Sequence, residues 1–246
     1  MFKRKNIIKI AIDSPAAAGA GTLAKAISKH YKLAYLDTGK AYRLIAFLKI
    51  KFPKKFNLNF VKKKINKLKI KELNNKMLLL DEVGTEASKI AKNKNIRKLI
   101  HSFQTSFAYN PPKKYKGSCL DGRDITYNIV PDANFKFFIT ANLKTRSIRR
   151  YKELKGLKKS ITYNEVLKSI KNRDKSDYNR KISPLKKTIT YNEVLKSIKN
   201  RDKSDYNRKI SPLKKTKDSM LINTTKLSKR ACFLKIKKII DRKLNI

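Results

Sequence analysis

Residues 7–27 read IIKIAIDSPAAAGAGTLAKAI, and this stretch decides the fold. Its first part, residues 7–12, is a short apolar run rich in isoleucine, which predicts a buried strand. Small residues follow at 14–21, and apolar residues then recur at helical spacing over 22–27. A strand, a turn of small residues and a helix in this order allow backbone N–H groups to surround phosphate oxygens. The stretch therefore predicts an α/β fold with a phosphate-binding turn.

The turn itself differs from the common phosphate-loop pattern G-x-x-x-x-G-K-[ST]. Ser14 stands in the first glycine position, Ala20 replaces the lysine, and Thr22 supplies the hydroxyl one residue late. Taken alone, the turn fits either a phosphate loop or an ordinary tight connection between a strand and a helix. The rest of the chain has to decide between these two interpretations.

The net charge of +45, from 63 Lys and Arg against 18 Asp and Glu, is extreme and allows two interpretations. A basic chain can bind nucleic acid by neutralising its phosphates. The lysines, however, are spread along the chain and outnumber the arginines, whereas a reader of the phosphate backbone is expected to rely on arginine. We therefore interpret most of this charge as lysines on solvated helix faces. A positive cleft would also attract anionic substrates.

Composition narrows the class of protein further. With 40% hydrophobic residues the chain can bury a core, and it contains no run of apolar residues long enough to span a membrane. Cys119 and Cys232 fit no metal-ligand spacing and are expected to be reduced core residues. We expect a cytoplasmic protein.

Strand and helix patterns alternate along the chain, as in a parallel sheet covered by helices on both faces. Apolar runs predict further strands at residues 33–36, 77–80, 117–120, 135–141 and 220–223. Helical spacing predicts helices at residues 41–50, 85–92, 95–107, 144–155 and 228–244. We expect a single domain, with a core (7–50, 117–160 and 217–246), a peripheral region (51–116) and the segment 161–216.

Residues 161–188 read ITYNEVLKSIKNRDKSDYNRKISPLKKT, and residues 189–216 repeat them letter for letter. Two copies are too few for a solenoid, so identity without drift indicates a recent tandem duplication or an error in the sequence. The copies begin with capping boxes, Thr162 with Glu165 and Thr190 with Glu193, followed by apolar residues at helical spacing. Each copy can therefore form its own amphipathic helix.

Several motifs in this chain resemble those of one family. Residues 36–43 (LDTGKAYR) are similar to the LD[ST]Gx[ML]YR stretch of bacterial cytidylate kinases. Residues 120–125 (LDGRDI) and 131–133 (PDA) resemble their LDGRDIGTVVFPDA, and 136–154 resembles their KFFLTAS…R..RRYKEL. Each repeat copy carries a lid-like R-D-x-x-D-x-N-R-x-x-x-P-L pattern, and residues 13–23 are similar to DGPA.SGKGTL. These matches run in family order from residue 10 to beyond 225, so together they are highly specific.

The resemblance implies a parallel five-stranded P-loop kinase core, a monophosphate-binding insertion and a lid, which this chain carries duplicated in tandem. It also implies the reaction ATP + CMP (or dCMP) ⇌ ADP + CDP (or dCDP), with Mg²⁺ bound to ATP. Such a transfer depends on holding two polyanions in line and neutralising their charge, which arginines do well. The expected partners are ATP and CMP or dCMP, with no membrane and no specific nucleic acid, and the chain is expected to be a monomer.

Carried over residue by residue, the resemblance assigns binding of the ATP phosphates to Ser14, Pro15, Ala16, Ala17, Ala18, Gly19, Ala20, Gly21 and Thr22. The catalytic residues that it implies are Asp121, Arg123 and Arg149. CMP would be bound by Asp37, Thr38, Arg43, Ser88, Arg97, Arg123 and Asp124. The lid would contribute Arg173, Asp177 and Arg180, or their counterparts Arg201, Asp205 and Arg208. No residue would bind the metal directly, but Thr22 and Asp121 would face the water shell of Mg²⁺.

The chain departs from the family pattern in ways that bear on activity. Ala20 removes a lysine at the transferring phosphate, and the loss of such a preorganised cation costs on the order of 10²–10³ in rate. Lys25 or Lys40 would have to compensate for it, and Thr126 replaces a glycine, so the turn around it is expected to differ. Three functions stay open at this point: an active cytidylate kinase, which we favour, a nucleotide-binding pseudokinase, and a basic nucleic-acid-binding protein.

Overall fold

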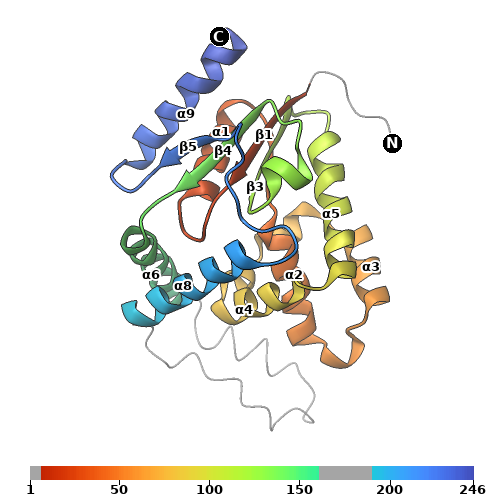
Figure 1. The fold of residues 1–246 in the computed structure, drawn as a ribbon. Coiled ribbons are helices and arrows are strands. Elements are labelled where there is room, and N and C mark those ends of the chain that lie inside the picture. Colours follow the sequence, from red (N-terminus) through yellow and green to blue (C-terminus); the bar gives the residue numbers. More distant parts are fainter. Residues whose placement is uncertain (1–6, 161–189) are drawn as a thin grey trace.

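The computed structural model describes residues 7–160 and 190–246, and within them five strands form one parallel sheet. The strands are β1 (Ile8–Asp13), β2 (Ala34–Asp37), β3 (Gly117–Gly122), β4 (Phe135–Thr140) and β5 (Met220–Asn223). Their order in the sheet is β2-β3-β1-β4-β5, which puts β1 in the centre (Figure 1). The predicted five-stranded parallel core is confirmed.

The register of the strands brings their carboxyl ends to one edge of the sheet. Asp13 lies opposite Gly122 of β3, and Asp37 of β2 lies opposite Asp121 of β3. Since all strands run in the same direction, the loops that leave them meet at this edge, where α/β proteins bind their ligands. The register therefore places the predicted phosphate turn beside the loop that carries Arg123 and Asp124.

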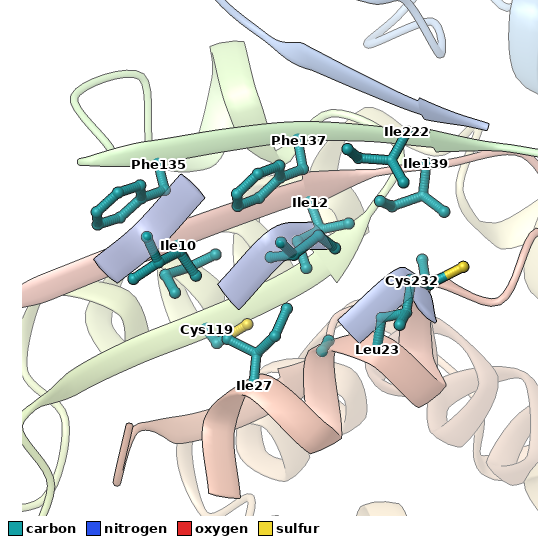
Figure 2. Close-up of a cluster of buried hydrophobic side chains, with 14 of the residues drawn as sticks. Ile10, Ile12, Leu23, Ile27, Cys119, Phe135, Phe137, Ile139, Ile222 and Cys232 are labelled. Carbon is teal, nitrogen blue, oxygen red and sulfur yellow. The ribbon is translucent and has the colours of Figure 1, made fainter. Parts of the chain in front are cut away.

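Helices cover both faces of the sheet, as the alternation of strand and helix predicts. On one face α1 (Ala20–His30) and α9 (Lys229–Leu244) pack against Ile10, Phe135 and Phe137. Figure 2 shows this cluster, in which the free cysteines Cys119 and Cys232 are both buried, as expected. The opposite face is covered by α2 (Gly39–Lys51) and α5 (Lys94–Tyr109), with Ala11 of β1 now facing that layer. Alternate residues of β1 thus enter two different cores, which is the period-2 pattern of a strand buried on both faces.

The peripheral region adds α3 (Leu58–Asn66) and α4 (Asp81–Ile90), which pack against α2 and α5 in a third apolar cluster. The expected strand at 77–80 is wrong, because Lys76–Leu79 forms a 3-10 turn instead. The Asn75 side chain accepts a hydrogen bond from the Met77 N–H, and Leu78 is fully buried. Arg43 of α2 donates to the Leu78 and Leu80 carbonyls, which in a strand would pair with a neighbouring strand.

Two further helices, α6 (Leu143–Ser160) and α8 (Tyr191–Asn207), lie below the sheet edge in Figure 1, and α8 comes from the second repeat copy. They pack against each other through Leu154 of α6 and Val194 and Ile198 of α8. The predicted capping box of the second copy is present, since Thr190 and Glu193 each accept a hydrogen bond from the backbone N–H of the other. The first copy, 161–188, lies outside the described residues. Among the described helices, none is both long and apolar enough to cross a membrane.

Candidate active site

A cavity of about 1270 Å³ opens at the carboxyl edge of the sheet. It is lined by the β1–α1 turn, by residues from β2 and β3, and by side chains from α2, α4, α5, α6 and α8. Every site residue predicted within the described part of the chain lines this cavity. Arg173, Asp177 and Arg180 of the first copy lie outside the described residues.

The phosphate turn runs from the end of β1 to the start of α1. Gly19, the residue before the helix, has φ of +94°, a conformation that glycine adopts without strain. The carbonyl of Ala16 accepts a hydrogen bond from Arg146 (3.1 Å), and that of Ala18 accepts bonds from Arg149 (3.1 Å) and Thr224 (2.8 Å). In a trans peptide the N–H points opposite to the carbonyl, so the N–H groups that follow these carbonyls face away from α6. This arrangement suits a turn that presents its N–H groups to an anion.

Three arginines surround one carboxylate on the other side of the cavity. Asp205 of α8 accepts a hydrogen bond from the Arg123 Nε at 2.6 Å, and it lies 3.7 Å from Arg208 and 4.0 Å from Arg201. Although burial opposes ionisation, Arg123 and its neighbours hold the pKa of Asp205 below its ordinary value. Burial and then the charge of Arg123 lower the pKa of Arg201, whose buried Nε finds no hydrogen-bond partner among the described residues. The group carries surplus positive charge, which an entering phosphate would neutralise.

The predicted nucleoside-binding residues lie at the α5 end of the cavity. Arg97 of α5 donates to the Asp124 carboxylate at 3.1 Å, and both side chains are about one-tenth exposed. The guanidinium of Arg97 also lies 5.5 Å from the centre of the Tyr42 ring. The Ser88 hydroxyl donates to a carbonyl one turn earlier in α4. The structure therefore brings Arg97, Asp124 and Ser88 to one wall of the cavity, beside an aromatic ring.

Two carboxylates of the cavity, Asp121 of β3 and Asp37 of β2, lie opposite each other and could face a divalent cation. Burial, followed by the charge of nearby Asp37, raises the pKa of Asp121 to about 8. The Tyr35 hydroxyl donates to this carboxylate at 2.8 Å, and a Cβ at Gly21 would lie 3.5 Å from it. Among the described residues no three His, Cys, Asp or Glu side chains gather as a metal cage. Mg²⁺ commonly binds through phosphates, water and one or two carboxylates, so this donor set fits it.

Asp13 fixes the loop after β3, which carries the predicted nucleoside-binding residue Asp124. Its fully buried carboxylate accepts hydrogen bonds from the Ile125 N–H (2.8 Å), the Thr126 N–H (3.0 Å) and the Thr126 hydroxyl (2.6 Å). Thr126, which stands where the family pattern has glycine, thus adds a third hydrogen bond to Asp13 at the start of the π-helical turn Ile125–Ile129. Burial has the larger effect and raises the pKa of Asp13 to about 6, although the hydrogen bonds from Thr126 and Ile125 lower it.

The stability of the folded chain is expected to depend on the protonation of Asp13. Its pKa rises from 3.8 to about 6 on folding, so its contribution to stability is complete below pH ~4 and is lost as the pH rises through ~6. The free energy of unfolding of the wild type should therefore fall across this window relative to Asp13→Asn, which cannot titrate. Urea unfolding at several pH values measures the difference, and a pH-independent difference would contradict the assignment.

Asp132→Asn provides a control with the opposite sign. Although burial opposes it, hydrogen bonds from Lys9 and Tyr109 hold the pKa of Asp132 below its ordinary value. The stability that ionised Asp132 contributes is present above its unfolded pKa and is lost as the pH falls.

A model of the cytidylate kinase family matches residues 10–190 and, in a second segment, residues 186–242. These two ranges span nearly the whole chain. The chain belongs to the cytidylate kinase family. The two matched ranges overlap at residues 186–190, where the repeat copies join, so each copy lies within a matched range.

Similar proteins named cytidylate kinase come from several bacteria. The one from Bartonella tribocorum is 42% identical over 180 residues, covering 71% of this chain and 80% of that protein. The one from Bartonella bacilliformis is 39% identical, with 73% and 82% covered. The one from Mesorhizobium japonicum is 35% identical, again with 73% and 82% covered.

Within this cytidylate kinase fold, the structure adds residues near the site to which the motifs did not assign a role. Arg146 of α6 donates to the Ala16 carbonyl and pairs with Asp202 of α8 at 2.6 Å. Arg150 lines the cavity and donates to the Leu79 carbonyl at 2.9 Å. A signal was available for these arginines, because Arg146, Arg149 and Arg150 at spacings of three and four share one helix face. No sequence pattern shows that Asp202 is their partner.

Proposed function

We propose that this chain transfers the γ-phosphoryl group of ATP to CMP or dCMP, giving ADP and CDP or dCDP. The observation that supports this most is that one cavity is lined by the phosphate turn, by the arginines around Asp205, and by Arg97 and Asp124. Two polyanions could enter from opposite sides of such a cavity and meet in line. Phosphoryl transfer requires little beyond this positioning and charge neutralisation.

In this proposal the backbone of residues 14–22 binds the ATP phosphates, and Arg146 and Arg149 position the turn from behind. Arg123, with Arg201 and Arg208 of the lid, binds the acceptor phosphate and the transferring group. Mg²⁺ bound to ATP would supply charge neutralisation at the phosphates, with Asp121 and Thr22 at its water shell. An oxygen of the acceptor phosphate is already anionic near neutral pH, so no side chain has to remove a proton. A direct catalytic role of Arg149 and a phosphate contact of Arg43 stay predictions.

The base would be recognised through its exocyclic amine. The Asp124 carboxylate accepts hydrogen bonds from Arg97 and Asn128, and it has further lone pairs for a cytosine amine. Uracil presents a carbonyl oxygen at that position, which a carboxylate would repel. Ser88 and Arg97 would contact the remaining polar atoms of the ring. Asp37 and Thr38 belong to the same pocket.

The proposal is tested by ADP formation with ATP, Mg²⁺ and each of CMP, dCMP, UMP, AMP and GMP. We expect CMP or dCMP to be the preferred acceptor. In Asp124→Asn we expect kcat/KM for CMP to fall by about 10²-fold, because the hydrogen bond from the cytosine amine to the carboxylate is lost. The ratio of kcat/KM for CMP to that for UMP should also decrease. Asp218→Asn, at an exposed carboxylate, is the matched control. The absence of CMP-dependent turnover in the wild type would reject the proposal.

The pseudokinase alternative is not favoured, because the relatives at 35–42% identity are named cytidylate kinases. The nucleic-acid hypothesis predicts tight, strongly salt-dependent binding to duplex or single strands, together with no turnover on the nucleotide panel. A monomeric state and a place in the cytoplasm stay predictions.

A further inference from the structure

The two repeat copies have the same side chains, so their chemistry cannot decide which of them serves the cavity. Residues 161–188 and 189–216 are identical at every position. Only their places in the chain differ: the first follows α6 directly, and the second leads into β5. The choice of copy must therefore depend on contacts with the rest of the fold.

The helix of the second copy is held against α6 by apolar and ionic contacts. Val194 and Ile198, each 3% exposed, pack against Leu154 of α6. One turn further along, Asp202 pairs with Arg146 at 2.6 Å, and both side chains are largely buried. Arg146 also donates to the Ala16 carbonyl, so this pair links the lid to the phosphate turn.

The segment after α8 is anchored as well. The Leu213 N–H donates to the Asp205 carbonyl at 2.7 Å, and the Leu213 side chain is 2% exposed. The Asn128 amide donates to the Ser211 hydroxyl at 3.2 Å, and the Tyr127 hydroxyl donates to the Pro212 carbonyl. Tyr127 and Asn128 belong to the loop that Asp13 fixes. Both ends of the second copy are therefore attached to elements that line the cavity.

We propose that the second copy, residues 189–216, is the working lid, and that the first copy is an insertion that the reaction does not need. The assignment rests on the proposed function. It makes Arg201 and Arg208 the lid arginines that contact nucleotide, with Asp205 between them and Arg123. Asp202 is a positioning residue, because it acts through Arg146 on the phosphate turn.

Deletion alone cannot test this assignment, because removing residues 161–188 or residues 189–216 leaves the same polypeptide. That single-lid chain is expected to keep CMP-dependent activity within a few-fold of the full chain. Loss of its activity would overturn the proposal that one copy is dispensable. The copies have to be marked by substitution to be told apart.

Twin substitutions provide the decisive experiment, since the chemistry is the same and only the copy differs. We expect Arg201→Ala to lower kcat/KM for CMP by at least about 10²-fold, because a preorganised charge donor is lost. The kcat/KM of Arg173→Ala should stay within about twofold of the wild-type value. Asp202→Asn should lower activity through a raised KM for ATP, whereas Asp174→Asn should not. Equal losses in both copies, or a loss only when both are changed, would overturn the proposal.

A structural readout separates failure of this assignment from failure of the proposed function. Asn128→Cys with Ser211→Cys should cross-link with a short thiol-specific bifunctional reagent, because the native side chains are hydrogen-bonded and the native cysteines are buried. Asn128→Cys with Ser183→Cys is the matched control and should not. Equal cross-linking of the two pairs would reject the second copy as the lid. If the wild type shows no CMP turnover but only the first pair cross-links, the proposed function fails and the placement of the copy stands.

Discussion

Arg123→Ala is expected to lower kcat with CMP by about 10²–10³-fold, the cost of removing a preorganised donor at developing charge. Arg123 leaves the carboxyl end of β3, where its Nε donates to Asp205 and its Nη1 donates to the Gly122 carbonyl. Its side chain is 19% exposed, so its charge acts in a partly dry cavity where Coulomb interactions are strong. Arg123→Lys should recover only part of the loss, because an ammonium cannot bind two phosphate oxygens in one plane.

Two controls accompany this prediction. Arg242→Ala removes an arginine with an exposed side chain on α9 and should leave kcat unchanged. The variant Arg123→Ala should remain folded, because Arg201 and Arg208 still lie within about 4 Å of Asp205. Thermal unfolding followed by circular dichroism checks this point. A folded Arg123→Ala protein with wild-type turnover would show that this arginine does not contact the reacting phosphate.

Ala20→Lys is expected to raise kcat, because it restores a cation to the phosphate turn. Ala20 lines the cavity at the first residue of α1, and a lysine at this position is expected to extend toward the ATP phosphates. A fully missing charge donor costs on the order of 10²–10³ in rate. Lys25 lies one turn further along α1 and also lines the cavity, with its ammonium 5.9 Å from the centre of the Tyr35 ring. We predict that Lys25 compensates in part, and we therefore expect a gain of about 10- to 100-fold.

The matched control is Ala20→Met, which has similar length and no charge. It should leave kcat unchanged or lower, because Ala20 also packs in the core cluster beside Leu23 and Ala24. A double-mutant cycle with Lys25→Ala then tests the compensation: that substitution should cost much more in the wild type than in Ala20→Lys. An unchanged rate in a folded Ala20→Lys protein would mean that another group already fills this role.

Local patterns were sufficient for most of the fold. Strand β5 begins and ends at the predicted residues, and β1 extends one residue beyond its apolar run because Asp13 continues the pairing with Gly122. The motifs also named residues that line one cavity, since they follow parallel strands whose carboxyl ends must meet. The prediction of a strand at 77–80 was wrong because a short apolar segment is equally typical of a buried turn and of a strand.

By itself, the sequence determined the five strands of the sheet, the capping box of α8, and the residue types required at a phosphate site, since each depends on spacing within a few residues. Only the tertiary structure decided which partners these residues find. Asp13 bonds to Thr126, Arg146 to Asp202 and Arg123 to Asp205, and each pair joins elements far apart in the chain. The same holds for the repeat, because identical copies have identical local preferences. Within the described residues, the second copy contacts α6 and the loop after β3.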